Sequence, residues 1–371
     1  MNLEVRGRID REYFQEILDL VPQVGLTALG VTDAEPFHET RLEIERRKKE
    51  GLHGGMQFTF RNPERSTSPK KIMKEAKSLI VGALRTPSPR LKEASHEKLR
   101  IAAYARRDYY TDLRNALNVI ADKLKDDGWK ATVVADENSL VDRAAAIRAG
   151  IGWHGKNGNV LIPGKGSWFV LGSVVTDACL PVSKPLEDDC GSCKRCIDSC
   201  PTGAIIEPGV VDARKCIAWL VQAPGVIPNE YRKSIGNRIY GCDDCQEVCP
   251  EGRDERLLEG KSDSNADHFV IEILEADDKE LLKKFGHWYI AERDPRYLRR
   301  NALIAIGNSN EKELFKSILE KYVKNSDPLL RSHAVWAAIN SGHKELVNLV
   351  KGDPDPLVLN EIILAEKEGC L

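Results

Sequence analysis

Hydrophobic positions along the first 180 residues alternate between a helical and a strand-like spacing. Residues 11–25 and 109–129 place apolar side chains every three or four positions, which predicts two amphipathic helices. Residues 26–34, 76–86 and 130–138 are short apolar runs next to turn-forming residues, which predicts strands. This alternation is typical of an α/β or α+β domain built on one central sheet.

Seven glycines fall between residues 143 and 177, in a stretch that begins like a helix and ends like a strand. Glycine adopts positive φ angles and lets the backbone approach a ligand closely, so the stretch either binds a ligand or forms tight turns. It contains neither the GxGxxG dinucleotide fingerprint nor a P-loop. Taken alone, the glycines favour tight turns.

The C-terminal part has helical spacing and an internal repeat. The segments RRNALIAIGNSN, from Arg299, and LRSHAVWAAINSG, from Leu330, resemble each other and place Ala302 and Ala334 at equivalent positions. Such a pair is typical of HEAT-like repeats. Two copies are too few to bury a core alone, so we expect them to pack on the preceding domain.

The composition is that of a globular protein with several domains: 371 residues, 42% hydrophobic and 30% charged. We expect domains at 1–180, 181–260 and 261–371. The net charge of −2 gives no overall attraction to nucleic acid, so such contact would need a local basic patch. No apolar run reaches the length of a membrane span and the N-terminus lacks a signal core, which favours a cytoplasmic protein without membrane contact.

Eight of the ten cysteines fall between residues 181 and 260. In a reducing compartment this number favours metal ligands over disulfides. The first four have the spacing C-x2-C-x2-C-x3-C-P of bacterial ferredoxins, in which three thiolates bind one cubane cluster and the fourth reaches a second cluster. They are Cys190, Cys193, Cys196 and Cys200, followed by Pro201.

The other four cysteines of this region complete the pattern. Crossed pairing predicts one 4Fe–4S cluster on Cys190, Cys193, Cys196 and Cys249, and the other on Cys200, Cys216, Cys242 and Cys245. An insertion departs from the ferredoxin pattern, because Cys216 lies 26 residues ahead of Cys242. Structural zinc is the alternative, but its cysteines usually come as two pairs. Iron–sulfur clusters transfer single electrons and need an acceptor, which these residues do not name.

Longer motifs give the chain a resemblance to a known family. They are RNPERSTSPKKIMKEAKSLIV, RDYYTDL, DENSLVDRAAAIRAGIGWHGKN, GSWFVLGSVVTD, the full cysteine set, NRIYGCDDCQEVCP, KFGHW and RRNALIAIGN. With them the chain resembles the epoxyqueuosine reductases nearly end to end. The glycine-rich stretch followed by this cysteine pattern makes the resemblance specific.

The resemblance implies an α+β multidomain fold: an N-terminal α/β cobalamin-binding domain, a two-cluster ferredoxin-like domain and C-terminal α-helical HEAT-like repeats. It implies an oxidoreductase that reduces the epoxide of epoxyqueuosine at the tRNA wobble position to the alkene of queuosine. Base-off cobalamin would lie between the first domain and the nearer cluster. An external electron donor and a monomeric state are expected as well.

The family's proton donor matches Asp136, at the head of DENSLVDR. Removing the epoxide oxygen as water takes two electrons and two protons, and a carboxyl in an apolar pocket has a raised pKa that lets it donate near neutral pH. The alternative is that Asp136 caps the helix beginning near Val141, with Asp142 or Ser139 sharing that task. With the resemblance, the donor role is favoured.

Other residues match family positions near the corrinoid. They are Arg65, Ala103, Lys156, Asn157, Val160 and Leu171, together with Asp136. Three departures from the family bear on pocket shape and substrate. Ser66 replaces an arginine, so that Arg65 beside it would substitute; Tyr110 replaces a histidine; and Glu137 adds a charge.

A local basic face for tRNA is expected near the first repeat. The candidates are Lys283, Arg296, Arg299 and Arg300. Helical repeats can present such side chains as a row along phosphates, and Trp288 and Tyr289 nearby could stack on an unpaired base. The alternative is a solvated helix face with a core tryptophan.

Other functions share parts of this pattern. A cobalamin-dependent reductive dehalogenase has the same cofactor layout, but the missing export signal and the HEAT-like tail count against it. A plain two-cluster electron-transfer protein would bind no corrinoid, and Asp136 would then be structural. A tRNA-binding module that has lost its chemistry is disfavoured by the intact cysteine set.

Overall fold

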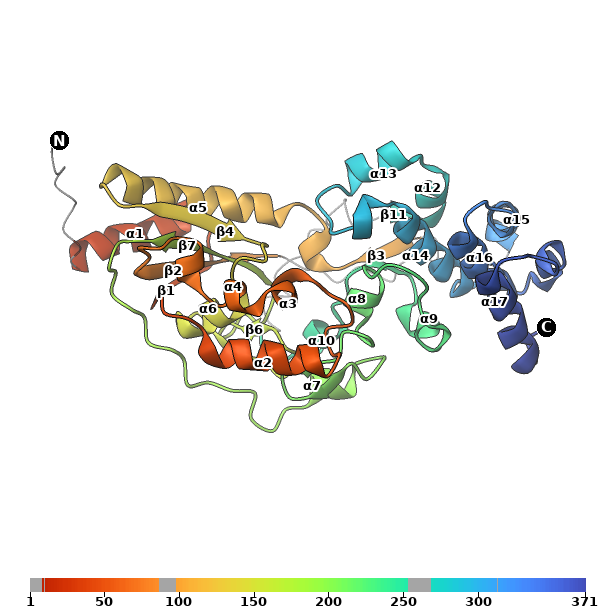
Figure 1. Cartoon of the computed structure of the whole chain (residues 1–371), viewed down its shortest axis with the longest axis horizontal. Helices are drawn as coiled ribbons and strands as arrows, with labels where there is room; N and C mark the ends of the chain where they lie inside the picture. Colours follow the sequence, from red (N-terminus) through yellow and green to blue (C-terminus); the bar gives the residue numbers. More distant parts are fainter. Residues whose placement is uncertain (1–8, 10, 87–97, 253–267, 312) are drawn as a thin grey trace. The chain divides into compact units, whose positions relative to one another are not determined.

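The computed structural model describes residues 9, 11–86, 98–252, 268–311 and 313–371 (Figure 1). The chain forms two compact units. Unit 1 consists of Met1–Pro89, Asp108–Arg214 and Asp244–Gly260, and unit 2 consists of Arg90–Arg107, Lys215–Asp243 and Lys261–Leu371. The middle range predicted from the sequence, 181–260, is thus shared between the two units. Within the described ranges, no helix combines the length and apolarity needed to cross a membrane.

Unit 1 is built around a four-stranded sheet in the order β1-β2-β7-β4, with every neighbouring pair antiparallel. The strands are β1 (Ala28–Asp33), β2 (Ser78–Arg85), β7 (Phe169–Thr176) and β4 (Ala131–Ala135). The three predicted strands and the strand at the end of the glycine-rich stretch are confirmed. The α/β description of this layer is wrong, because α/β folds use parallel strands joined by crossover helices.

Helix α5 (Tyr109–Asp126) covers one face of this sheet. Gly82 and Gly172 are paired between β2 and β7, and a Cβ on them would lie 2.9 Å and 3.0 Å from Leu117 of α5. Because both side chains are missing, Leu117 packs directly on the sheet backbone. The predicted helix at 109–129 is confirmed.

Helix α6 (Asp142–Arg148) covers the opposite face. Val81 precedes Gly82 and therefore points away from α5; it packs in the same core as Ala145 and Ala146 of α6. A Cβ on Gly30 of β1 would lie 2.1 Å from the carbonyl oxygen of Ala149, so this end of α6 also rests on backbone. The packing fixes α6 and, with it, the loop that joins β4 to α6.

Further elements complete the described part of unit 1. They are α1 (Arg11–Gln23), α2 (His38–Lys49), α3 (Phe58–Arg61), α4 (Pro63–Ser66), η1 (Pro69–Lys71), β5 (Trp153–His154), β6 (Val160–Leu161), α7 (Arg195–Asp198), β8 (Ile205–Glu207), β9 (Val210–Val211) and α10 (Asp244–Glu247). Strands β5 and β6 form one antiparallel hairpin, and β8 and β9 form another. The helix predicted at 11–25 is confirmed as α1.

Unit 2 joins a small sheet, β10-β3-β11, to an array of helices. Its described elements are β3 (Lys98–Ile101), η2 (Ala103–Ala105), α8 (Ile217–Leu220), α9 (Asn229–Ile235), β10 (Arg238–Tyr240), β11 (His268–Phe269), α12 (Val270–Glu275), α13 (Asp278–Lys284), η4 (Ala291–Arg293), α14 (Arg296–Gly307), η5 (Glu313–Phe315), α15 (Lys316–Val323), α16 (Pro328–Ser341), η6 (Lys344–Val350) and α17 (Pro356–Lys367). One hydrophobic core runs from β3, α8 and β10 into α14–α17.

The two similar C-terminal segments form α14 and α16, which pack on each other. Ala302 and Ala334 are both fully buried in them. A Cβ on Gly307 would lie 2.3 Å from the ring of Trp336, so glycine lets the two helices approach closely. The helices share their core with elements that precede them in the chain, as expected for a pair too short to bury a core alone. Their HEAT-like character stays a prediction.

A buried ion pair between α9 and α17 gives a stability prediction. Arg232 Nη2 donates to Glu361 Oε1 at 2.6 Å, and their side chains are 1% and 8% exposed. Because Glu361→Ala would strand a buried guanidinium, we expect the free energy of unfolding to fall by about 3–5 kcal/mol, measured by chemical denaturation. Glu320→Ala breaks the exposed pair with Lys324 and should barely move the unfolding midpoint. Equal effects of the two variants would contradict this reasoning.

Candidate functional site

Four cysteines from two segments of unit 1 line one small pocket. Its volume is about 100 Å³. The lining residues are Trp153, Lys156, Asn157, Leu161, Asp189, Cys190, Cys193, Arg195, Cys196, Cys249, Pro250 and Glu251. Cys196 lies on α7 and Cys249 follows α10, and these two helices pack on each other. The fold therefore brings Cys249 to the three thiols that lie more than fifty residues earlier in the chain.

The electrostatics of this pocket fit a bound cationic metal cluster. Burial raises the pKa of the Cys249 thiol, and the thiolates of Cys190, Cys196 and Cys193 raise it further. Burial likewise raises the pKa of Cys196. Bound iron would remove this cost by stabilising the thiolates. Among the described residues, no three His, Cys, Asp or Glu side chains lie close enough together to bind a single metal ion. The four cysteines line the wall of the pocket.

The other four cysteines are divided between the units. Cys200 and Cys245 belong to unit 1, and Cys216 and Cys242 belong to unit 2. Cys200 Sγ accepts a hydrogen bond from the backbone N–H of Ala204 at 3.2 Å, a contact that stabilises a thiolate. Cys216 is the N-cap residue of α8. The assignment of these four to one cluster stays a prediction.

Tight turns and close backbone packing account for the glycine-rich stretch. Gly158 has a φ of +78°, and its N–H donates to the carbonyl oxygen of Gly155 at 2.9 Å, which closes the β5–β6 turn. A Cβ on Gly152 would lie 2.2 Å from the carbonyl oxygen of Leu161 across the hairpin. The same turn brings Lys156 and Asn157 to the thiol pocket, so the turns themselves build part of the site.

Asp136 is the first residue after β4 and has the left-handed φ of +54°. A non-glycine residue in this region stores strain on the order of 1–3 kcal/mol, which is typical of functional loops. The residue is exposed, and its carboxyl has no hydrogen-bond or ion-pair partner among the described residues. Surrounding protein nevertheless desolvates it and raises its pKa to about 6, against an opposing effect of Arg114. Such a carboxyl holds its proton much closer to neutral pH than an ordinary aspartate.

The alternative role of Asp136 as a helix cap is wrong. The N-cap residue of α6 is Val141, and no side chain caps this end. Ser139 donates its hydroxyl to Glu137 instead, at 3.1 Å. Asp142 begins α6, and its pKa is raised well above the ordinary value by burial and, to a smaller extent, by the charge of Asp136. Asp142 is thus a second carboxyl that interacts electrostatically with Asp136, an interaction that the sequence did not indicate.

The residues matched to corrinoid contacts do not all share one unit. Ala103 belongs to unit 2, where its N–H donates to Asp243 Oδ2 at 2.7 Å. Arg65 is an exposed residue of α4 in unit 1. Ser66 beside it is buried and donates to the carbonyl oxygen of Asn62 at 3.0 Å. Ser66 therefore stabilises the local helix, and of the two neighbours only Arg65 is available to a ligand.

Val160 and Leu171 connect the thiol pocket to the Asp136 loop. Val160 is buried in β6, and Leu171 of β7 packs against the same core, which also contains Leu140 of the loop. Leu171 precedes Gly172, which pairs with Ala135, the residue before Asp136. The hairpin at the pocket and the loop with the raised-pKa carboxyl are therefore joined through one apolar cluster of unit 1.

Arg300 does not contact tRNA phosphates, and this prediction is wrong. Its side chain is fully buried in unit 2. The guanidinium donates to carbonyl oxygens at the end of α8 and just beyond it, those of Leu220, Val221, Ala223 and Gly225, at 2.5–3.4 Å. These carbonyls lack helical partners, so the guanidinium caps them. Desolvation lowers the pKa of Arg300 to about 9.

Arg296 and Arg299 are half-buried and already hold carboxylates. Arg296 pairs with Asp294 at 2.5 Å and with Asp327 at 3.5 Å. Arg299 pairs with Asp278 at 2.6 Å. A phosphate would have to displace these partners, so the two arginines form a weaker basic face than the sequence indicated.

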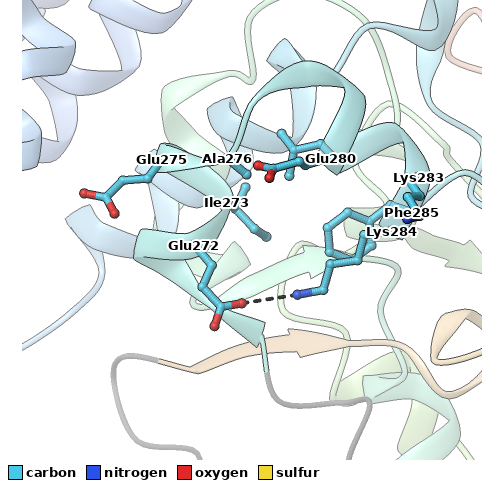
Figure 2. A pocket seen from close by; sticks show the side chains of 9 residues that line it. Glu272, Ile273, Glu275, Ala276, Glu280, Lys283, Lys284 and Phe285 are labelled. Atoms are coloured by element: carbon cyan, nitrogen blue, oxygen red, sulfur yellow. Dashed lines mark hydrogen bonds and ion pairs between the residues drawn. The ribbon is translucent and has the colours of Figure 1, made fainter.

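Lys283 is exposed and lies on the wall of a pocket between α12 and α13, which Figure 2 shows. The pocket has a volume of about 660 Å³. Three carboxylates share its wall with Lys283 and Lys284: Glu272, Glu275 and Glu280. Lys284 lies 3.2 Å from Glu272. The surface around Lys283 therefore carries mixed charge.

The two aromatic candidates differ in exposure. Trp288 is buried, donates its indole N–H to the carbonyl oxygen of Ala105 at 2.7 Å, and stacks 4.3 Å from both Tyr240 and Phe285. It is a core tryptophan, which was the alternative interpretation. Tyr289 is 40% exposed and therefore keeps an accessible edge for a base.

Trp153, Leu161 and Glu251 line the thiol pocket without having been expected there. The indole N–H of Trp153 is buried and has no acceptor in the part of the chain that the structure describes. Iron–sulfur clusters are held by cysteine thiolates, so tryptophan, leucine and glutamate carry no cluster signal. The available signal was position: two of them stand in the glycine-rich stretch, and Glu251 follows the Cys249–Pro250 pair.

Known proteins match the chain along nearly its whole length. The family described as a 4Fe-4S double cluster binding domain matches residues 189–252. The epoxyqueuosine reductase of Bacillus anthracis is 32% identical over 377 residues, which cover 95% of this chain and 98% of that relative. The epoxyqueuosine reductase of Bacillus subtilis is 34% identical over 335 residues, which cover 87% of this chain and 86% of the relative.

Known structures match the fold. A crystal structure of epoxyqueuosine reductase with an epoxyqueuosine-modified tRNA-Tyr stem loop has a TM-score of 0.84 and 30% identity, covering 95% of this chain and 97% of that chain. The Bacillus subtilis enzyme with its catalytic loop swung out of the active site has a TM-score of 0.83 and 29% identity, covering 94% and 97%. Identity above 30% across almost the entire length is decisive, and this chain belongs to the epoxyqueuosine reductase family.

Proposed function

We propose that this protein reduces epoxyqueuosine to queuosine at the wobble position of tRNA, using cobalamin reduced through two 4Fe–4S clusters. The observation that carries the proposal is the match over 95% of the chain to an epoxyqueuosine reductase with an epoxyqueuosine-modified tRNA stem loop. The double-cluster match over residues 189–252 supports the iron–sulfur part.

The reaction defines what the site must supply. Conversion of the epoxide to an alkene breaks two C–O bonds, forms the C=C bond and releases the oxygen as water, which consumes two electrons and two protons. Asp136 would donate a proton to the departing oxygen. Its pKa of about 6 leaves about a tenth of the side chain protonated at pH 7, far more than for an ordinary aspartate.

The cluster ligands would be the two sets given by crossed pairing. Cys190, Cys193, Cys196 and Cys249 would hold one cluster. This set is supported by the fact that all four residues line the same pocket of unit 1. Cys200, Cys216, Cys242 and Cys245 would hold the other. Two clusters deliver the two electrons one at a time, which matches the electron count of the reaction.

Cobalamin, in its base-off form, would supply the reactive centre for cleaving the C–O bonds, which iron–sulfur clusters alone do not provide. The chain would hold it through Arg65, Ala103, Lys156, Asn157, Val160 and Leu171, beside Asp136. Val160, Leu171 and Leu140 share one apolar cluster, and Leu171, its partly buried member, would pack against an apolar face of the macrocycle and help to exclude water from the reacting atoms.

The loop from Asp136 to Val141 would be the catalytic loop. A Bacillus subtilis relative has its catalytic loop swung out of the active site. In this chain the loop begins with a strained φ of +54° at Asp136 and leaves that carboxyl without a described partner. Both features favour a loop that changes conformation between substrate entry and reaction.

The tRNA would contact unit 2 through Lys283, Arg296 and Arg299, with Tyr289 as a stacking ring. Because both arginines already hold aspartates, binding would exchange carboxylates for phosphates and depend strongly on salt. A monomeric cytoplasmic enzyme with an external electron donor and HEAT-like repeats completes the proposal.

The rate should fall as pH rises through about 6, because the donor must be protonated and the pKa of Asp136 is raised to about 6. Above that value, the protonated fraction of Asp136 falls about tenfold for each pH unit. We would measure single turnovers of pre-reduced enzyme from about pH 5 to about pH 8. A rate that is flat or rises over this range would remove Asp136 from the donor role.

Cofactor content and substrate choice separate this function from its rivals. Anaerobically reconstituted protein should contain about eight irons per chain and bind cobalamin. A plain electron-transfer protein would bind the iron but not cobalamin. A reductive dehalogenase would bind both and convert halogenated aromatics but not a modified tRNA stem loop. Conversion of the stem loop alone is the result expected for the proposed function.

A further inference from the structure

We propose that Lys156 is a positioning residue for the cluster on Cys190, Cys193, Cys196 and Cys249: it fixes the ligand loop and places a positive charge that favours the reduced cluster. This inference rests on the proposed function, because it assumes a cluster on those thiols. It gives the Lys156 ammonium a role towards the cluster, beyond the corrinoid contact expected from the sequence.

The ammonium of Lys156 donates to two carbonyl oxygens of the ligand loop. Its Nζ lies 2.5 Å from Gly191 O and 3.0 Å from Cys193 O. Both acceptors lie between Cys190 and Cys196, so the two bonds span the turn that carries three of the four thiols. Charge-assisted bonds are stronger than neutral ones, and an ammonium has the donors to keep both.

The backbone that carries Lys156 is itself fixed. The carbonyl oxygen of Lys156 accepts the N–H of Gly209 at 3.0 Å, and the N–H of Gly155 donates to Asn159 O at 2.8 Å. Asn157 Oδ1 accepts the N–H of Asn159 at 3.0 Å, which forms an Asx turn. A long, flexible side chain thus starts from a rigid base and ends in two defined bonds.

The same hairpin is tied to the helix next to the proposed acid. Arg143 Nη1, on α6, donates to the carbonyl oxygen of Gly158 at 2.9 Å. Arg143 follows Asp142 directly, and α6 follows the loop that begins at Asp136. The bonds of Lys156 therefore connect the ligand loop, through one short hairpin, to the element that positions the catalytic loop.

The charge of Lys156 acts on the cluster from the pocket wall. A cluster gains one negative charge on reduction, so a nearby cation stabilises the reduced form and raises the reduction potential. Lys156 is half-buried, and solvent therefore screens it less than the exposed Arg195 on the same wall. The wall also carries Asp189 and Glu251, whose carboxylates oppose this effect, so Lys156 offsets local negative charge.

An EPR-monitored redox titration of the reconstituted full-length protein tests this role without relying on turnover. In Lys156→Met, the reduction equilibrium of this cluster should become about tenfold less favourable, which is about 59 mV for one electron. Lys156→Arg keeps the charge and can donate to the same carbonyls, so it should restore most of the potential. Lys194→Met removes an exposed charge from the same loop that does not line the pocket, and its shift should be much smaller.

Three results decide the matter. A lowered potential in the Met variant, rescued by Arg, supports the inference, and so does selective loss of this cluster from the Met variant with rescue by Arg. An unchanged potential, or a shift no larger than that of Lys194→Met, overturns it. Wild-type protein without the signals of two 4Fe–4S clusters would instead overturn the proposed function, so the two failures are distinguishable.

Discussion

Replacing Asp136 with Asn is expected to lower turnover by about 10²–10⁴-fold, the usual loss when a general acid is removed. Asparagine has nearly the same shape but no proton to donate. Because Asp136 has no hydrogen-bond partner in the described residues, the change breaks no structural contact. Iron content, cobalamin binding and unfolding midpoint should stay at wild-type levels. Single-turnover conversion of the modified stem loop by pre-reduced protein measures the effect on chemistry.

Glu137→Gln is the matched control for this variant. Glu137 is the neighbouring carboxylate in the same loop and accepts a hydrogen bond from Ser139, which an amide oxygen can also accept. The negative charge of Glu137 makes the smallest of the contributions that raise the pKa of Asp136. Turnover should therefore change little. Full activity of Asp136→Asn, or an equal loss in both variants, would show that the loop needs no specific acid at Asp136.

Replacing Cys249 with Ala is expected to remove one cluster and abolish turnover. Iron should fall from about eight to about four per chain, because a cubane needs its fourth thiolate while the other cluster uses different cysteines. The pocket in unit 1 makes the assignment specific: Cys249 should disable the same cluster as Cys193, although Cys245 is its closer neighbour in sequence.

The comparison of three variants resolves the pairing. Cys249→Ala and Cys193→Ala should leave the same EPR spectrum, that of the remaining cluster, whereas Cys245→Ala should leave the other spectrum. Cys179→Ala is the control, because Cys179 is exposed and outside both sets. Identical spectra for Cys249→Ala and Cys245→Ala would instead mean that the clusters use consecutive cysteines.

Helices and strands whose apolar periodicity extends over a few residues were predicted correctly from the sequence. The period of apolar positions located α5, because Leu113, Leu117, Ile120 and Leu124 are all buried and recur every three or four residues. The strands β1, β2 and β4 were located for the same reason. Helix and strand periodicities reflect contacts on one face of one element, so they can be read without knowledge of the partner.

Features that depend on which segments meet could not be obtained in this way. The antiparallel pairing of the central sheet was not predictable from the separate strands. Nor was the composition of the units, in which Arg90–Arg107 and Lys215–Asp243 belong to unit 2 although unit 1 segments flank them in the sequence. Arg300 shows the physical reason most clearly. From its place beside Arg299 in a helix, Arg300 would be expected to face solvent. Carbonyl oxygens at the end of α8, almost eighty residues earlier, accept its hydrogen bonds and so offset the cost of burying its charge.

The candidate site was predicted unevenly for a related reason. Metal ligands depend on residue type and spacing, so the cysteines were identifiable from the sequence. The choice of Asp136 rested on resemblance, and its strained φ and raised pKa became visible only in the fold. Lys156 was expected near a ligand, but its two bonds to the cysteine loop depend on a hairpin whose position no local pattern reports.

The most direct test of this account is nucleoside mass spectrometry of tRNA treated with the protein. Anaerobically reconstituted, chemically reduced protein would be incubated with cobalamin and an epoxyqueuosine-containing tRNA-Tyr stem loop, with Asp136→Asn in parallel. We expect conversion of epoxyqueuosine to queuosine by the wild type and almost none by the variant. Intact epoxyqueuosine after incubation with wild-type protein that holds both clusters and cobalamin would contradict it.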